Sequence, residues 1–403
     1  MAHIEDRWYK TVVGDDGKKK RVKTGLHGKG LRYRVRYVAP DGRERSQSFP
    51  DREKKQAEDF LIKIENDKRA QTYVDPHAGR ISFRQYAEQW LATVAVDEST
   101  RENYGSRLRN HILPFFGTRS LASIKPEMVR HWDRASGLAV ATRAVNFAIL
   151  QAIFNAAIDD ERIAKNPCAA KSVTAPKPEP RTVVPWTAGQ VLAVRSGLLD
   201  RYRSMVDVAA GCGVRQGEAF GLSIDDLDND AGWLHVRRQV KRVKHRLVFG
   251  LPKSDKERRV PLPARVSQAL KMHVEQFPPV EVTLPWEDPD STKLVTVPLV
   301  FTSLRPYAIN RNSFDPKHWH RALRHAGIAP GRDSGMHALR HFYASVLLDA
   351  GENVKALSEY LGHANAAFTL RVYAHLMPGS QDRTRRAIDE MFGENGPDGL
   401  ATA

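Results

Sequence analysis

The sequence predicts a multidomain α+β protein in which a small sheet-plus-helix module, an all-α domain and a mixed α/β domain follow one another. Its 403 residues exceed the roughly 150 of an average domain. The apolar pattern also changes along the chain, from period two to helical spacing and then to a mixture of both. A proline-rich stretch precedes the last part. We therefore expect a module at 1–75, a helical domain at 80–168, a linker at 169–185, a third domain at 186–392 and a flexible tail at 393–403.

Composition narrows the class of protein. The 63 Lys and Arg residues outnumber the 47 Asp and Glu residues, which gives a net charge of +16, and 41% hydrophobic residues can form real cores. No uninterrupted apolar run approaches the roughly 18 residues of a membrane span, and the N-terminus lacks a signal peptide. Two cysteines, Cys168 and Cys212, cannot form a disulfide framework or a zinc cluster. We expect a cytoplasmic protein without membrane contact. Its charge favours a polyanion partner, although many basic proteins bind none.

The N-terminal segment concentrates this positive charge. Residues 18–45 contain eleven Lys or Arg and two acidic residues. Residues 31–37 alternate with period two, a turn follows at 40–42, and a second short run ends at Phe49, which predicts a hairpin. Apolar residues at helical spacing over 57–64 predict a helix on the apolar face. The other face presents Arg32, Arg34 and Arg36, which we interpret as DNA-phosphate contacts; a merely solvated sheet face remains the alternative.

Helical periodicity dominates the next segment. It predicts helices at 82–94, 99–116, 126–135 and 139–159, with Val145, Phe147, Ile149, Leu150, Ile153, Phe154 and Ile158 of the last helix as the core. The stretch from Lys171 to Pro185 contains four prolines and resembles an extended linker. Further on, residues 278–298 hold five prolines, which predicts a long surface loop.

The third segment contains the residues that suggest chemistry, although each cluster alone is a weak signal. They are glycine-flanked Arg215, Lys253 between two short β-runs at or beside a hairpin tip, His337-x-x-Arg340 on one helix face, His363 after Leu361-Gly362, and Tyr373. A tyrosine hydroxyl can attack a phosphodiester and form a covalent phosphotyrosine. Guanidinium groups can hold the phosphate oxygens, and a lysine or histidine can protonate the leaving oxygen. No carboxylate cluster for metal-dependent cleavage is evident, so we expect neither a metal nor another cofactor.

The order of these residues resembles the tyrosine recombinase (phage integrase) family. The resemblance implies that Arg215 and Arg340 bind the scissile phosphate and that Tyr373 attacks it. It further implies that Lys253 is the general acid, with nearby Lys256 as the alternative, and that His337 acts in acid–base chemistry. His363 would hydrogen-bond the phosphate, and Glu218 would support the site without reacting.

The first two segments are also similar to modules of that family. Residues 80–168 resemble the helical, SAM-like core-binding domain, and the arginine-rich module resembles an arm-type DNA-binding domain. The resemblance implies a site-specific DNA recombinase that acts through a 3′-phosphotyrosine, without metal or ATP, and integrates or excises a mobile element. Implied partners are double-stranded DNA with core-type and arm-type sites, further copies in a homotetramer, an excisionase and a host DNA-bending protein. It also implies a protomer contact by the tail around residues 383–392.

Two other functions remain open at this stage. A type IB topoisomerase shares the tyrosine chemistry but relaxes supercoils, and a DNA-binding regulator could retain the fold without the reaction. Among nearby residues, we interpret His341 and Phe342 as core packing, and His375 as a surface or packing residue.

Overall fold

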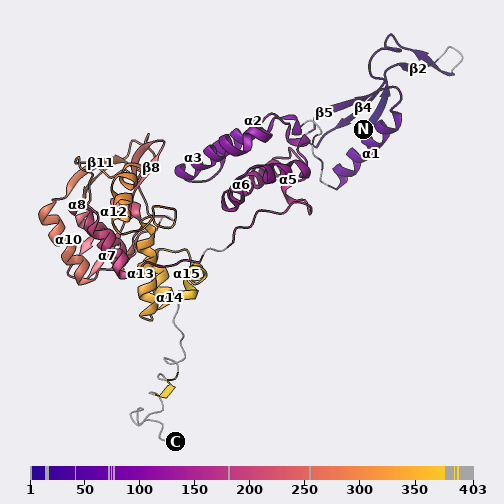
Figure 1. The fold of residues 1–403 in the computed structure, drawn as a ribbon. Coiled ribbons are helices and arrows are strands. Elements are labelled where there is room, and N and C mark those ends of the chain that lie inside the picture. Colours follow the sequence, from indigo (N-terminus) through magenta and orange to yellow (C-terminus); the bar gives the residue numbers. More distant parts are fainter. Residues whose placement is uncertain are drawn as a thin grey trace, which may run out of the picture. The chain divides into compact units, whose positions relative to one another are not determined.

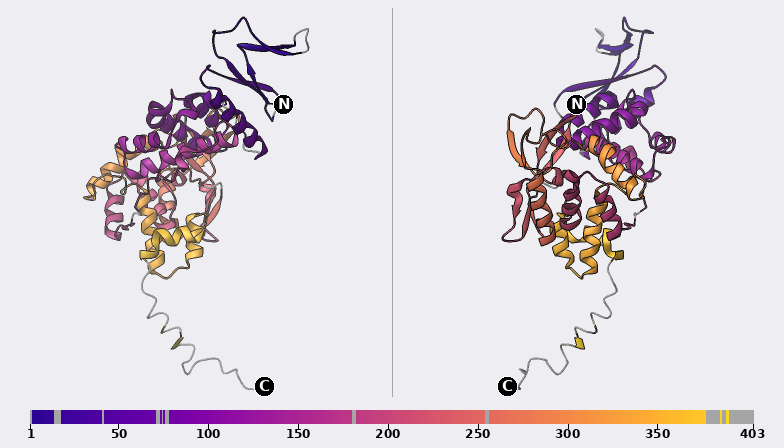
Figure 2. Two further views of the ribbon diagram at one scale, coloured as in Figure 1. Left: turned by 90° about the vertical axis from the view of Figure 1, so that its right-hand side faces the viewer. Right: turned by 60° about the vertical axis from the view of Figure 1, so that its left-hand side comes forward.

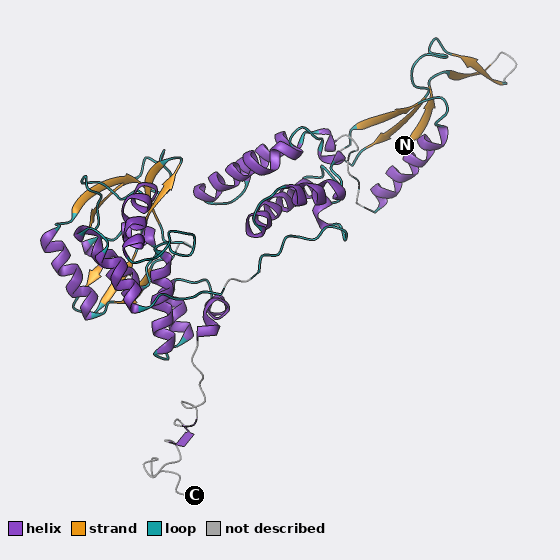
Figure 3. Cartoon of the chain, in the orientation of Figure 1, coloured by secondary structure: helices purple, strands orange, loops and turns teal. Residues whose placement is uncertain are grey.

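The computed structural model describes residues 2–13, 18–40, 42–70, 73, 75, 78–179, 182–253, 256–376, 385, 388 and 389. The chain divides into two units, residues 1–179 and 180–403. The first holds strands followed by helices, and the second mixes strands with helices (Figures 1 and 3). The α+β class predicted from the sequence is therefore confirmed. The tail at 393–403 and most of residues 383–392 lie outside the described residues.

The N-terminal module is an antiparallel sheet with one helix against its apolar face. The strands lie in the order β1 (His3–Asp6), β4 (Tyr33–Val38), β5 (Glu44–Phe49). Alternate residues Tyr33, Val35 and Tyr37 are buried against α1 (Lys54–Arg69), as the period-two pattern predicts. Leu31 precedes the strand and is exposed, so its predicted place on this face is wrong. A separate two-stranded ribbon, β2 (Tyr9–Val13) and β3 (Lys19–Lys23), has no counterpart among our predictions.

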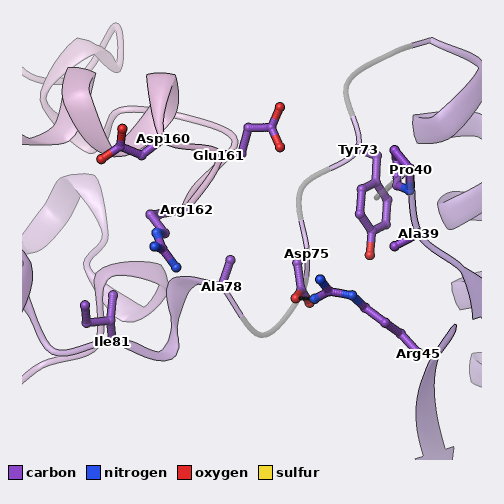
Figure 4. A pocket seen from close by; sticks show the side chains of 10 residues that line it. All are labelled: Ala39, Pro40, Arg45, Tyr73, Asp75, Ala78, Ile81, Asp160, Glu161 and Arg162. Carbon is purple, nitrogen blue, oxygen red and sulfur yellow. Dashed lines mark ion pairs between the residues drawn. The ribbon is translucent and has the colours of Figure 1, made fainter. Parts of the chain in front are cut away.

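The described residues that follow α1 pack against this same sheet (Figure 4). The Tyr73 hydroxyl donates to the Tyr37 hydroxyl at 3.4 Å, and their ring centroids are 6.1 Å apart. Asp75 forms an ion pair with Arg45 of β5. These contacts add Tyr73 and Asp75 to the packing of the module.

The helical domain contains the four helical segments that the sequence predicts. These are α2 (Phe83–Thr93), α3 (Glu98–Arg107) continued by a π-helical turn into α4 (Leu113–Phe116), α5 (Pro126–Ala135) and α6 (Val140–Asp159). Ser82 and Asp97 accept backbone N–H groups of the first turns of α2 and α3, which satisfies donors that a helix start leaves open. The Phe83 ring lies 5.7 Å from Phe116 and 5.6 Å from Phe154, between centroids, at the centre of the core.

Helix α6 is the main core helix of this domain. Phe147, Ile149, Leu150, Ile153 and Phe154 are buried as predicted, whereas Val145 is 42% exposed and does not belong to the core. In the described part of the chain, α6 alone is long and apolar enough to cross a membrane by length and composition. Its buried residues contribute to the same cluster as α2, α4 and α5, which is the environment of a core helix.

The second unit is built around one continuous hydrophobic cluster. Helix α8 (Asp200–Cys212) packs there against both α10 (Ala264–Gln276) and α13 (His337–Asp349). Helices α13, α14 (Val354–Leu361) and α15 (Ala366–Tyr373) gather at one end of this unit (Figure 2). The remaining helices are α7 (Ala188–Ser196), α9 (Gln216–Phe220), α11 (Arg311–Phe314) and α12 (His320–His325).

The described strands of the second unit form three small antiparallel sheets. The first has the order β10 (Arg258–Pro261), β7 (Trp233–Val236), β6 (Leu227–Asp228), and the second pairs β8 (Gln239–Val243) with β9 (Arg246–Gly250). The third pairs β11 (Val280–Pro285) with β12 (Leu294–Leu299). The surface loop predicted at 278–298 is therefore wrong. Val282, Leu284, Val297 and Leu299 alternate into the core, and the prolines are tolerated because a two-stranded sheet consists of edge strands.

Candidate active site

Arg215 lies at the start of α9, immediately after the end of α8. Its Nη1 atom donates to the Glu218 carboxylate at 2.8 Å. Its Nη2 atom donates to the carbonyl oxygen of Gly362 at 3.3 Å, although the two residues are 147 positions apart. The guanidinium group is thus fixed by one neighbour in sequence and one distant helix end.

Arg340 lies on α13 and is fully buried, with 0% of its surface exposed. Its Nη1 atom donates to the Gly213 carbonyl at 2.7 Å, and its Nη2 atom donates to the Leu361 carbonyl. The buried Nε atom has no hydrogen-bond partner among the described residues. Burial and then the charge of Arg215 lower the pKa of Arg340, while Glu218 acts in the opposite direction, as expected for a buried cation whose charge is compensated only in part.

Two helix ends bind these arginines. Gly213 ends α8 with a φ of 64°, and Gly362 ends α14 with a φ of 59°. The last carbonyls of a helix have no partner within the helix and carry partial negative charge, so they suit a guanidinium group. A Cβ at position 213 would lie 2.4 Å from the Tyr343 ring, and the left-handed backbone also favours glycine. The glycines beside Arg215 and His363 therefore shape the site.

Glu218 connects the arginine pair to the strands. This carboxylate is 3% exposed and accepts hydrogen bonds from Arg215 and, at 2.9 and 2.6 Å, from both terminal nitrogens of Arg258 on β10. Burial alone would raise the pKa of Glu218, but Arg258, Arg215 and Arg340 together lower it to about 2. Sequence reasoning missed Arg258 because it lies in a run of charged residues and no local pattern distinguishes it.

The cluster has an excess of positive charge. Three guanidinium groups, those of Arg215, Arg258 and Arg340, act on the single carboxylate of Glu218. Two positive charges in this cluster are therefore not compensated by Glu218. A buried surplus of this kind is costly unless an anion occupies the site. The geometry predicts that the arginine pair binds an anionic group.

Tyr373 ends α15 and is 2% exposed. Its hydroxyl oxygen lies 2.8 Å from Nδ1 of His341 on α13. Burial raises the pKa of Tyr373 to about 12, while Arg340 and Arg215 act in the opposite direction. The candidate nucleophile therefore lies within electrostatic reach of both candidate phosphate-binding arginines.

His341, which we interpret as a packing residue, is half-buried and contacts the hydroxyl of Tyr373. It is one helical turn beyond His337, and the two ring centroids lie 4.6 Å apart. The spacing of four residues, which places two side chains on one helix face, was the available signal. His337 itself begins α13 and is exposed. Desolvation and then the charges of His341, Arg340, Arg215 and Lys253 lower its pKa.

His363 directly follows the end of α14. Its Nδ1 atom lies 2.8 Å from the Thr369 hydroxyl. Burial first, and then Arg340 and Arg215, lower the pKa of His363 to about 3, so its imidazole is neutral at pH 7. With Thr369 donating to Nδ1, the Nε2 atom carries the proton and can donate to an oxygen of a bound anion.

Lys253 is exposed and lies between β9 and β10. Because β9 pairs with β8 and β10 pairs with β7, the segment joins two sheets. The predicted place at a hairpin tip is wrong, since alternation along two strands does not reveal which strands pair. The charge of Lys253 helps to lower the pKa of His337, so it acts on this site. Lys256, the alternative, is also exposed.

Arg34 and Arg36 of the N-terminal module lie on the face of β4 opposite its buried residues, and Arg32 directly precedes the strand. Arg32 pairs with Asp6 and Asp51, and Arg36 pairs with Glu5 and Glu44, both at 3.1 Å. Local sequence could not reveal these acids, because several come from neighbouring strands. The Nε atom of Arg34 is buried and lacks a hydrogen-bond partner in the part of the chain that the structure describes.

The part of the chain that the structure describes contains no group of three or more His, Cys, Asp or Glu that could hold a metal ion. Cys212 is buried, and burial raises the pKa of its thiol to about 12.

Comparisons with known proteins match both units. Residues 194–379 match the profile described as "Phage integrase family", and residues 82–133 match "Phage integrase, N-terminal SAM-like domain". The putative prophage phiRv2 integrase of Mycobacterium tuberculosis is 29% identical over 389 residues, which cover 94% of this chain and 98% of that protein.

Solved structures show the same fold. The integrase of transposon Tn1549, in complex with transposon right end DNA, has a TM-score of 0.64 and 22% identity over 77% of this chain and 99% of its own. A lambda integrase tetramer bound to a Holliday junction has a TM-score of 0.55 and 16% identity over 82% of this chain and 93% of its own. With both units matched, the chain belongs to the phage integrase family and is a tyrosine recombinase, an enzyme of site-specific DNA recombination.

Proposed function

We propose that this chain cleaves and rejoins DNA at the arginine cluster, with Tyr373 as the nucleophile. The observation that carries the proposal is the electrostatic proximity of Tyr373, Arg215 and Arg340, which come from three separate parts of the chain. Nucleophilic attack on a phosphodiester needs a hydroxyl group that lies beside positively charged, anion-binding side chains.

Each candidate residue then has a distinct role. Arg215 and Arg340 hold the non-bridging oxygens of the scissile phosphate and stabilise the charge that develops during attack. His363 donates a further hydrogen bond to the phosphate, and His337 contributes to acid–base chemistry. Lys253 protonates the departing 5′ oxygen, while Glu218 keeps Arg215 in position.

The product of cleavage is a 3′-phosphotyrosine and a free 5′ hydroxyl. Because the phosphodiester energy is kept in the covalent bond, rejoining needs no ATP. The guanidinium groups supply the charge stabilisation that other nucleases obtain from metal ions. Attack by the 5′ hydroxyl of a partner strand then exchanges the strands, so a mobile element is integrated or excised.

We further propose that the parts of the chain divide the binding of double-stranded DNA. Residues 80–168 would bind the core site together with the catalytic domain at 186–392, with 169–185 as the linker between them. Residues 1–75 would bind a separate arm-type site. The related lambda integrase was solved as a tetramer on a Holliday junction, and we propose a homotetramer here, assisted by an excisionase and a host DNA-bending protein in the bacterial cytoplasm.

The test is removal of one oxygen atom. Tyr373→Phe keeps the ring in the core but removes the nucleophile, so DNA affinity should persist while covalent adducts disappear. The probe is a duplex selected from a random-sequence pool by covalent capture on the unchanged protein. An adduct formed by the Phe variant would refute the role of Tyr373, and the absence of any captured duplex would favour the inactive-regulator alternative. Efficient relaxation of plasmid that lacks the selected site would favour the topoisomerase alternative.

A further inference from the structure

The hydrogen bond between His341 and Tyr373 joins two helices at the reacting atom. Nδ1 of His341 and the hydroxyl oxygen of Tyr373 are 2.8 Å apart, although the residues are 32 positions apart in sequence. Their ring centroids lie 5.6 Å apart with an interplanar angle of 63°. The nitrogen therefore reaches the hydroxyl, and the rings do not stack face to face. This is hydrogen-bond contact with the proposed nucleophile itself.

The nucleophile needs a proton acceptor. Burial raises the pKa of Tyr373 to about 12, so its hydroxyl is protonated at neutral pH. A neutral phenol is a weak nucleophile, and attack on phosphorus becomes favourable when a positioned base removes the proton during the reaction. Arg340 and Arg215 favour the tyrosinate but cannot accept a proton, since guanidinium groups are donors only.

His341 is in the protonation state that this task requires. Burial first, and then the charge of Arg340, lower its pKa to about 4, whereas Asp333 raises it. The facing groups are Tyr373 from α15, His337 and Arg340 from α13, and Asp333 from the segment before α13. The imidazole is therefore neutral at pH 7, and its Nδ1 accepts from the hydroxyl when Nε2 carries the ring proton. A bound phosphodiester adds a negative charge and raises the basicity of this imidazole.

We propose that His341 is the general base of DNA cleavage, an assignment that rests on the proposed function. As the oxygen of Tyr373 bonds to phosphorus, its O–H bond breaks and the proton moves to Nδ1 of His341. The bond between phosphorus and the 5′ oxygen breaks at the same time, and the leaving oxygen takes a proton from Lys253. On rejoining, the 5′ hydroxyl attacks phosphorus and its proton returns to the neutral amine of Lys253, while His341 returns its proton to the Tyr373 oxygen as the phosphotyrosine bond breaks.

The geometry favours His341 over His337 for this step. His337 precedes it by one turn, and the two rings meet edge to face at an interplanar angle of 80°. Within the described chain, the Tyr373 hydroxyl forms a hydrogen bond with His341 and not with His337. His337 is left to act on the phosphate or on the leaving-group side.

The experiment measures single-turnover formation of the covalent adduct on the duplex captured by the unchanged protein. His341→Ala should slow cleavage by about 10²- to 10⁴-fold, the usual contribution of a positioned acid or base. His341→Asn offers an amide oxygen that can accept the hydrogen bond but cannot take the proton, so it should be similarly slow. His325→Ala is the matched control, because this exposed histidine on α12 lies outside the site. It should cleave at the original rate.

Chemical rescue separates the base from the acid. Replacing Tyr373 by a fluorinated tyrosine makes the phenol more acidic, so the reaction depends less on a base. This change should restore much of the rate to His341→Ala but not to Lys253→Ala. A bridging 5′-phosphorothioate should do the reverse, because a thiolate leaves without a proton.

The outcomes are distinguishable from failure of the proposed function. If the unchanged protein captures no duplex, the proposed function is refuted and the role of His341 falls with it. If it captures one and His341→Ala cleaves it at the original rate, only the base assignment is overturned. Full activity of His341→Asn would show that the side chain merely positions the hydroxyl, which also overturns proton transfer. Equal effects of the fluorinated tyrosine on His341→Ala and Lys253→Ala would also overturn proton transfer to His341.

Discussion

Replacing the buried carboxylate of Glu218 by an amide should destabilise the catalytic unit at neutral pH. Glu218→Gln keeps the size and shape of the side chain but removes its negative charge. Arg215 and Arg258 would then share a neutral partner in a site where Glu218 is 3% exposed. The carboxylate of Glu218 accepts hydrogen bonds from Arg215 and Arg258 through both of its oxygens. In the glutamine variant, the amide nitrogen is itself a donor, so it would face an arginine N–H group and that hydrogen bond would be lost.

Two arguments give the same magnitude. Removing one partner of a buried ion pair costs about 3–5 kcal/mol. Independently, the pKa of Glu218 falls from 4.5 to about 2 on folding, and each unit is worth about 1.4 kcal/mol, so the ionised carboxylate contributes about 3 kcal/mol. At roughly 2–4 °C per kcal/mol for a unit of this size, the melting temperature should fall by about 6–12 °C.

Scanning calorimetry of the full chain at pH 7 measures this shift, with Glu275→Gln as the control. Glu275 is an exposed glutamate on α10, so its substitution should change stability by less than about 0.5 kcal/mol. Equal melting temperatures for Glu218→Gln and Glu275→Gln would refute the idea that Glu218 neutralises the arginine cluster.

The pH dependence provides a second test. Because folding lowers the pKa of Glu218, its contribution is complete above about pH 4.5 and is lost as the pH falls through the folded value. The difference in stability between the unchanged protein and Glu218→Gln should therefore shrink from pH 5 towards pH 2. A difference that stays constant over this range would contradict the assignment.

The remaining predictions concern the general acid and the N-terminal module. Lys253→Ala should cleave slowly and should recover on a bridging 5′-phosphorothioate duplex. Arg215→Ala should lose about 10²–10³ in cleavage rate, as variants without an oxyanion donor do, and should not recover on that duplex. Equal recovery of the two variants would contradict the division of roles. Arg34→Ala should reduce the slope of log affinity against log salt for duplex DNA by about 1, the expected loss for one phosphate contact. Arg36→Ala should change that slope less, because Glu5 and Glu44 already neutralise Arg36. A larger change for Arg36→Ala than for Arg34→Ala would contradict the idea that these ion pairs keep Arg36 from the phosphates.

Local periodicity predicted most of the fold. The helices at 82–94, 126–135 and 139–159 agree closely with α2, α5 and α6, because each has its own apolar face and end signals. The prediction of a loop at 278–298 is wrong because it rests on the five prolines of this stretch. Alternation of Val282 and Leu284, and of Val297 and Leu299, was present in the same stretch and carried the correct signal.

Long-range partners could not be predicted in the same way. The charge partners of Arg32 and Arg36 include residues of other strands. A strand can therefore lack acidic residues in its own sequence and still be neutralised by acidic residues of its neighbours in the folded module. The role of Arg258 likewise becomes visible only in the folded unit. There β10 places its guanidinium group beside Glu218, and its Nε atom donates to the Tyr360 carbonyl at 2.7 Å. Such contacts depend on sheet order and helix packing, which a local pattern does not specify.

The contact between His341 and Tyr373 is a case of its own. Helical spacing places His337, Arg340 and His341 at positions i, i+3 and i+4 on one face, so the signal was local and available. The same spacing is also found where a histidine simply packs, so it does not specify a role. Yet Arg340 is 0% exposed and Tyr373 is 2% exposed, so the most buried residues of this unit include its candidate reacting groups. At a site that must shift the pKa values of its side chains, burial is part of the chemistry, so burial alone does not distinguish a packing residue from a reacting one.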